Sequence, residues 1–134
     1  MRDDIQIKDD LYAYLKTSTL MTGQNKVNGV LRKTRRPLNS DKEDVVISVL
    51  ANQNGEIQNS YVNVNVYVPD QYRDNQYEEN SARLRTLCDI CKTLLLKHID
   101  VLYQFELESQ RVLEVNGKNE HFINNRLLYK TLNE

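Results

Sequence analysis

The stretch from Asn59 to Pro69 alternates strictly between valines and polar or aromatic residues. Successive side chains of a β-strand point to opposite faces of a sheet, so this period of two predicts a strand with one buried face. Burial of its four valines, Val62, Val64, Val66 and Val68, contributes roughly 6–12 kcal/mol before the entropy of ordering the chain is subtracted. A shift of one residue would bury tyrosines and asparagines instead, so the valines fix the register of the strand.

The other face of this strand carries amide and phenol groups and no charge. Such groups form hydrogen bonds readily and suit contact with a partner surface, although a face that only meets solvent is the commoner explanation. We call Tyr61, Asn63, Asn65 and Tyr67 the polar strand face. Our hypothesis is that these four residues lie in an interface.

Length and composition indicate a globular protein. A chain of 134 residues has the size of one domain, so we expect a single domain over residues 1–134. Hydrophobic residues make up 40% of the chain, which is enough for a core. The formal net charge of −1 gives no general attraction to nucleic acid or to anionic membranes.

The N-terminus is charged throughout and has no apolar segment of the kind found in signal peptides. The longest apolar run within a predicted helix is Leu94 to Leu96, far shorter than a membrane span. We therefore expect a cytoplasmic protein with no membrane partner.

Two segments show the apolar spacing of three and four residues that is typical of amphipathic helices. The first runs from about Asp4 to Thr17, and the second from about Glu78 to His98. We expect the apolar stripe of the second helix to cover the valine face of the long strand. The segment between the long strand and this helix, Pro69 to Tyr77, is expected to be a polar connection.

Alternating patterns and turn signals predict the remaining strands. Val45 to Ala51 is a continuous apolar strand, and Asn54-Gly55 predicts a hairpin into the long strand. After Asp100 the pattern returns to a period of two, and Asn116-Gly117 predicts a second hairpin. The last strand then runs from about His121 to Thr131.

A short strand near Val30 and Leu31 completes the order α-β-β-β-α-β-β. Strands joined by tight turns, with helices between groups of strands, predict an α+β fold. We expect an antiparallel sheet of about four to five strands with two α-helices packed on one face.

The pair Cys88 and Cys91 has the spacing of half a zinc site or of a redox pair. A structural zinc site needs four ligands, and the chain has no other cysteine. Both residues also lie in the apolar stripe of the second predicted helix, where a free cysteine behaves as a small hydrophobic residue. We expect both to be core residues, with no metal site and no cofactor.

The only basic cluster follows the short predicted strand. It could meet phosphates, but no aromatic platform or known nucleic-acid motif accompanies it. We expect no sequence-specific nucleic acid and interpret the cluster as a solvated loop or as a segment that forms salt bridges at a protein interface. We call its residues, Arg32, Lys33, Arg35 and Arg36, the basic segment.

The sequence disfavours an enzyme. Its carboxylates do not combine with histidine or serine in a known catalytic spacing, and its four glycines form no phosphate-binding loop. Catalytic groups that meet only in three dimensions are an open alternative.

The last predicted strand has apolar residues on both faces, with Ile123, Leu127 and Tyr129 on one side and Phe122, Leu128 and Leu132 on the other. A strand of this kind lies in the middle of a sheet or contacts another subunit. Together with the polar strand face, it favours self-association.

The order and length of these elements resemble the tail terminator proteins of bacteriophages and prophages, also called tail completion or head-tail joining proteins. The similar parts are D-D-L-Y-A-Y-L-K, V-L-R-K-T-R-R-P, V-V-I-S-V-L-A, Y-V-N-V-N-V-Y-V-P-D, R-L-R-T-L-C-D-I-C-K-T-L-L-L and H-F-I-N-N-R-L-L-Y, which cover most of the chain.

The resemblance implies a structural protein that forms a ring, commonly a hexamer, on the end of the tail tube. Such a ring stops the growth of the tube and presents a surface to the head connector, while DNA passes through its lumen without sequence-specific contact. The polar strand face and the basic segment are our candidates for its two contact patches. The alternative is a small cytosolic α+β protein-binding module without catalytic activity.

Overall fold

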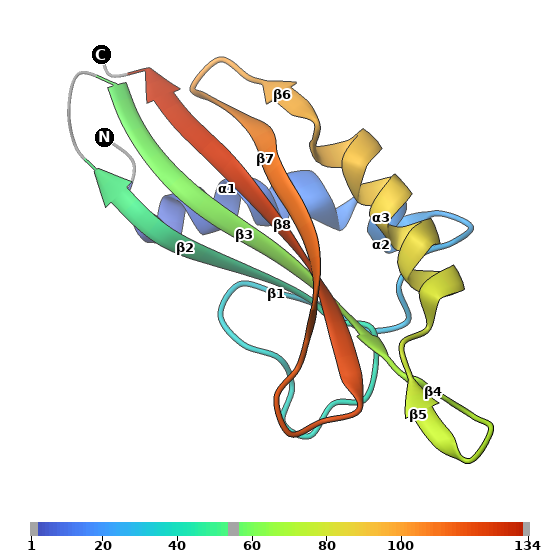
Figure 1. Cartoon of the computed structure of the whole chain (residues 1–134). Helices are drawn as coiled ribbons and strands as arrows, with labels where there is room; N and C mark the ends of the chain where they lie inside the picture. The colour runs from blue at the N-terminus through green and yellow to red at the C-terminus, as the bar shows by residue number, and fades with distance from the viewer. Residues whose placement is uncertain (1–2, 54–56, 133–134) are drawn as a thin grey trace.

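The computed structural model describes residues 3–53 and 57–132 of the chain (Figure 1). The helices are α1 (Asp4–Lys16), α2 (Thr19–Thr22) and α3 (Ser81–Leu95). The strands are β1 (Leu31–Arg32), β2 (Val45–Gln53), β3 (Ile57–Pro69), β4 (Gln71–Arg73), β5 (Gln76–Glu78), β6 (Lys97–Ile99), β7 (Tyr103–Glu114) and β8 (Glu120–Leu132).

Six of these strands form one twisted sheet in the order β1-β2-β3-β8-β7-β6. Its neighbours pair antiparallel except for β1 and β2, which run parallel. The last strand, β8, lies between β3 and β7, so the interpretation of a central strand with two apolar faces is confirmed. The remaining strands, β4 and β5, form a separate two-stranded hairpin.

The α+β class and the antiparallel hairpins are confirmed, whereas the number of elements was predicted too low. The sheet has six strands instead of four to five, and α2, the β4–β5 hairpin and β6 extend the expected order. The expected turn at Asn54-Gly55 lies outside the described residues, although β2 and β3 pair antiparallel as predicted.

The segment 69–77 is not a plain connection, because most of it forms the hairpin. Asp74 and Asn75 adopt positive φ angles of 54° and 64°, the backbone conformation of a tight two-residue hairpin turn. The second helix therefore begins later than expected. Asn80 caps it, and its side-chain oxygen accepts a hydrogen bond from the Arg83 amide at 3.3 Å.

The same helix also ends earlier than expected, at Leu95. The next residues form β6, which pairs with β7 by placing Lys97 opposite Glu106. His98 does not continue the helical stripe but packs as an edge-strand residue, with its ring 4.4 Å from that of Tyr14. Pairing with β7 thus overrides the helical pattern of the sequence at this point.

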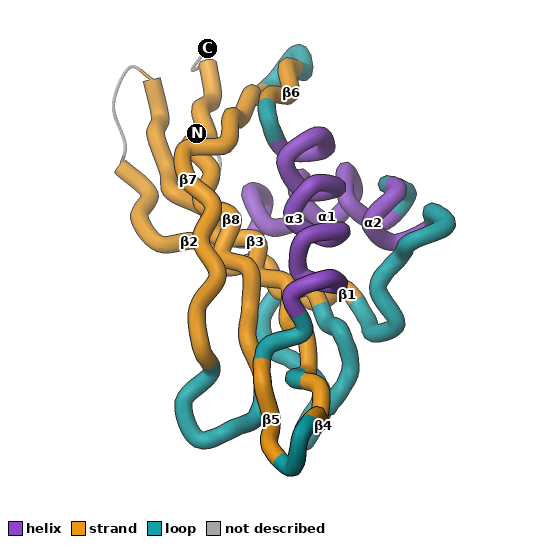
Figure 2. Tube along the Cα trace, turned by 45° about the vertical axis from the view of Figure 1, so that its right-hand side comes forward, coloured by secondary structure: helices purple, strands orange, loops and turns teal. Residues whose placement is uncertain are grey.

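The helices α1 and α3 lie on one face of the sheet, as Figure 2 shows. The valines of β3 are fully buried beneath them, as the alternating pattern predicts. The other large contributors to this core are Ile7, Leu11, Leu15, Leu20, Val45, Ile47, Leu84, Leu87, Cys91, Leu95, Phe105, Ile123, Leu127 and Tyr129.

Adjacent leucines of β8 lie on opposite faces and offer a direct test of this layering. Leu127 is buried on the face of the sheet that the helices cover, and Leu128 is half-buried on the face that no described helix covers. We expect Leu127→Ala to lower the free energy of unfolding by about 2–5 kcal/mol, because it leaves a cavity in the core. Leu128→Ala is the matched control and should cost clearly less in the same urea titration. Equal losses for the two variants would contradict the layering.

Candidate functional site

The candidate site is the face of the sheet that lies away from α1 and α3. Because the alternate residues of β3 are buried in the core, the polar strand face points to this uncovered side. All four of its residues are half-buried by their neighbours on the adjacent strands. The pattern of the sequence therefore places these residues together on one surface.

Each residue of the polar strand face meets a residue of β8 across the strand pair. Tyr67 stacks on Phe122 with ring centroids 5.4 Å apart. The amide of Asn124 donates a hydrogen bond of 2.7 Å to the side-chain oxygen of Asn65. Side chains on this face thus hold one another in place, which lowers the entropy cost of binding a partner.

A cation also joins this face. The guanidinium of Arg126 lies 4.3 Å from the ring centroid of Tyr61, and its Nε lies 3.2 Å from a carboxylate oxygen of Glu108. Sequence analysis did not select Arg126 as a site residue. The sequence does contain a signal for Arg126, because the alternation of the last strand places position 126 on the same side as Phe122 and Leu128.

The basic segment divides into residues with different surroundings. Arg32 and Arg35 are exposed, and Lys33 forms an exposed ion pair of 2.9 Å with Asp9 of α1. Arg36 instead turns inward, and its side chain is only 15% exposed. The structure therefore leaves Arg32 and Arg35 accessible for a partner, while Arg36 has a role inside the fold.

Arg36 binds two carboxylates that are each only 1% exposed. Its Nη1 and Nη2 donate to the two oxygens of Glu120 at 2.6 and 2.9 Å, and its Nε donates to Asp44 at 3.0 Å. The guanidinium also lies 4.2 Å from the ring centroid of Tyr67. The basic segment and the polar strand face thus meet at this one pair of residues, Arg36 and Tyr67.

The network shifts the ionisation of its members. Burial alone would raise the pKa of Asp44, but hydrogen bonds from Ser40, the Val30 amide and Arg36 outweigh it and hold that pKa below its ordinary value. Burial likewise opposes the charge of Arg36, yet Glu120 and Asp44 raise its pKa above the ordinary arginine value. Both groups are therefore charged at neutral pH.

A third buried carboxylate, Glu43, precedes Asp44 and connects the loop to α3. Its oxygens accept hydrogen bonds from Arg83 at 2.7 and 2.9 Å. The backbone of Gly29 passes so close that an added Cβ would collide with Asp44 and with the Glu43 carbonyl. These contacts hold the loop between α2 and β2 against the helix α3 and against the sheet.

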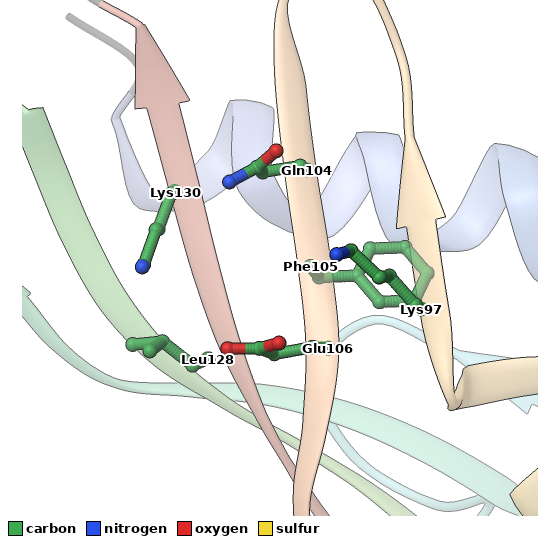
Figure 3. Close-up of a pocket in the computed structure, with 6 residues that line it drawn as sticks. All are labelled: Lys97, Gln104, Phe105, Glu106, Leu128 and Lys130. Atoms are coloured by element: carbon green, nitrogen blue, oxygen red, sulfur yellow. The ribbon is translucent and has the colours of Figure 1, made fainter.

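A small hollow of about 170 Å³ opens near the β6 edge of the sheet, and Figure 3 shows the side chains around it. It is lined by Lys97, Gln104, Phe105, Glu106, Leu128 and Lys130. Two ammonium groups and one carboxylate make its rim mainly cationic.

The two cysteines pack as core residues, as expected. Cys91 is fully buried, and burial raises the pKa of its thiol to about 12. Burial also raises the pKa of Cys88, which is partly exposed and packs against the core cluster. Neither thiol is activated as a nucleophile at neutral pH. Within residues 3–53 and 57–132, no three histidine, cysteine, aspartate or glutamate side chains converge in a way that could hold a metal.

No protein-family model and no curated protein matches this sequence. The fold, however, is similar to that of a chain in the virion of a native gene transfer agent particle. The two share 9% sequence identity, and the match covers 95% of each chain with a TM-score of 0.56. At this identity the likeness establishes a common fold. Among the described helices, none is both long and apolar enough to span a bilayer.

Replacement of Arg36 tests whether the buried network holds the fold together. Arg36→Met removes the cation that two buried carboxylates share and leaves Glu120 only the more distant Lys118 at 3.6 Å, so we expect the free energy of unfolding to fall by about 3–5 kcal/mol at pH 7. Arg35→Met removes an exposed charge next to it and should change stability by less than about 0.5 kcal/mol. Urea denaturation of both variants measures the difference, and a small effect of Arg36→Met would refute a structural role.

The effect of Arg36→Met should depend on pH. In the wild-type protein the lowered pKa of Asp44 contributes stability above the unfolded pKa of about 3.9, and this is lost as the pH falls through the folded pKa. In the variant, protonation of the two buried carboxylates instead removes the charges that have lost Arg36. The difference in unfolding free energy between the two proteins should therefore shrink from pH 7 toward pH 3, whereas a constant difference would show that the lost interaction is not electrostatic.

Proposed function

We propose that this chain is a structural protein of a phage-like virion, which forms a ring at the end of the tail tube and joins tail to head. The observation that carries the proposal is the likeness in fold to a virion chain over 95% of both proteins. The resemblance of the element order to tail terminator proteins supports the same assignment from the sequence. On this proposal the protein assembles in the host cytoplasm and remains in the virion.

The proposal assigns the function to surfaces and gives no residue a catalytic role. A ring of identical subunits needs two different contact patches on each subunit. The polar strand face offers one, because its stacked and hydrogen-bonded side chains present a rigid surface. Arg32 and Arg35 of the basic segment offer cations for contact with another subunit, the tail tube or the head connector.

A protein-binding module is the second candidate function. The uncovered face combines Tyr61, Tyr67 and Phe122 with amide groups, and aromatic residues are enriched in protein interfaces. Such a module would use the same face for a different protein and would not need to form a ring.

The mass of the protein in solution separates the two candidates. We expect light scattering after size-exclusion chromatography to give a particle of about six times 15.7 kDa, or a monomer that moves toward that mass as its concentration rises. Electron microscopy of that particle should then show a central hole. A monomer at every concentration and salt condition would contradict self-assembly and favour the binding module.

A further inference from the structure

The β4–β5 hairpin exposes two aromatic rings to solvent. Tyr72 and Tyr77 lie opposite each other on the two strands and pack edge to face, with ring centroids 5.0 Å apart. The turn between them holds Asp74 and Asn75 in the left-handed region, which costs free energy for residues other than glycine. A lone two-stranded hairpin is also marginal in water. We call this hairpin with its two tyrosines the arm.

The segment that follows α3 exposes a cluster of aliphatic side chains. Leu96, Ile99, Val101 and Leu102 are 65%, 65%, 85% and 53% exposed, and they lie within seven consecutive residues. A concentration of large apolar residues on a surface is typical of a contact site. We call these four residues the apolar tip.

The arm and the apolar tip lie at opposite ends of α3, as Figures 1 and 2 show. The arm precedes the helix and the apolar tip follows it, so about 22 Å of helix separates them, at 1.5 Å per residue. Neither feature can therefore cover the other within one subunit. Two different apolar features at opposite ends suit a head-to-tail contact between copies.

The hollows beside the two features differ in charge: the one beside the arm is mainly acidic, and the one beside the apolar tip has two lysines and one glutamate, with Asp100 inside the tip itself. The hollow next to the arm is lined by more acidic than basic groups. Figure 3 shows the hollow around Lys97, Lys130 and Glu106, and Lys97 directly follows Leu96 of the apolar tip. Contact between two arms would bring carboxylates together, whereas contact between an arm and an apolar tip brings the carboxylates beside the arm near Lys97 and Lys130. The acidic hollow contains Asp70, Glu78, Glu79 and Glu114 against Lys118 and His121, while its fifth carboxylate, Glu120, is only 1% exposed and is paired with Arg36.

We propose that the arm of one subunit packs against the apolar tip of the next copy of this chain. The tyrosine rings bury the exposed aliphatic side chains, and the acidic surface beside the arm faces Lys97 and Lys130. Because the arm and the apolar tip are different surfaces, each subunit contacts one neighbour through its arm and another through its tip. Repetition of this contact from subunit to subunit gives a closed ring or an open chain. The inference rests on the proposed function and adds to the polar strand face and the basic segment a further contact between neighbouring subunits of the ring.

Two variants test this contact, each changing one side of it. The arm variant carries Tyr72→Ser and Tyr77→Ser, and the tip variant carries Ile99→Asp. The control is Ile5→Asp, because Ile5 is 68% exposed on α1 and resembles Ile99 in type and exposure. In light scattering we expect the arm and tip variants to be monomers and the control to assemble like the wild-type protein. Thermal unfolding checks that each variant is folded. If the arm or tip variant is not, the single variants Tyr77→Ser and Lys97→Glu replace it in the same measurement.

Mixing the variants distinguishes a head-to-tail contact from other kinds of association. The arm variant keeps an intact tip and the tip variant keeps an intact arm, so an equal mixture should give a particle of about twice 15.7 kDa. No complex in the mixture, full assembly of either variant alone, or a wild-type protein that stays monomeric would each overturn the proposed contact.

The outcomes also separate this contact from the proposed function. A wild-type ring that persists in both variants would overturn the arm-to-tip contact and leave the ring proposal standing. Open chains of the wild-type protein that dissociate in both variants would support the contact and contradict the ring.

Discussion

The ion network around Arg36 is the interaction on which the arrangement of the loop and the sheet depends. One guanidinium joins Asp44, the residue just before β2, to Glu120 at the start of β8, which are 76 residues apart (120 − 44). All three residues are largely shielded from water, so their charges are stabilised by one another. Asp44 also accepts a hydrogen bond from the amide of Val30, which holds β1 beside β2. The parallel strand pair and the end of the central strand are therefore fixed by the same charges.

The network also shapes the uncovered face of the sheet. The Arg36 guanidinium lies over Tyr67, and Tyr67 stacks on Phe122, so the end of the polar strand face is built on a buried salt bridge. Farther along, the hydrogen bond from Asn124 to Asn65 and the contact of Arg126 with Tyr61 restrict the remaining side chains. A surface restrained in this way can bind a partner without first being ordered.

Sequence reasoning succeeded where a pattern repeats and failed where an element is short or a contact is distant. The strict alternation of β3 predicted both of its faces because the residues from Asn59 to Pro69 follow the same period. The elements α2, β4, β5 and β6 span only three or four residues each, too few for a period to show. For the site, Arg35 and Arg36 are indistinguishable in the sequence, since the partner that separates them, Glu120, lies 84 positions after Arg36. The arm depends on two residues with positive φ in a segment that is merely polar in composition.

The position of β8 has a consequence for how the chain folds during its synthesis. This strand comes last in the element order, yet it pairs with β3 over thirteen residues, from Ile57 with Leu132 to Pro69 with Glu120. While the ribosome is still producing residues 120–132, β3 has β2 on one side and an empty place on the other. Contacts between residues so distant in sequence form slowly, and an open strand edge can pair with other chains in the meantime. Completion of the sheet is thus delayed until translation has passed β8, and each nascent chain spends that interval with one edge of β3 unpaired.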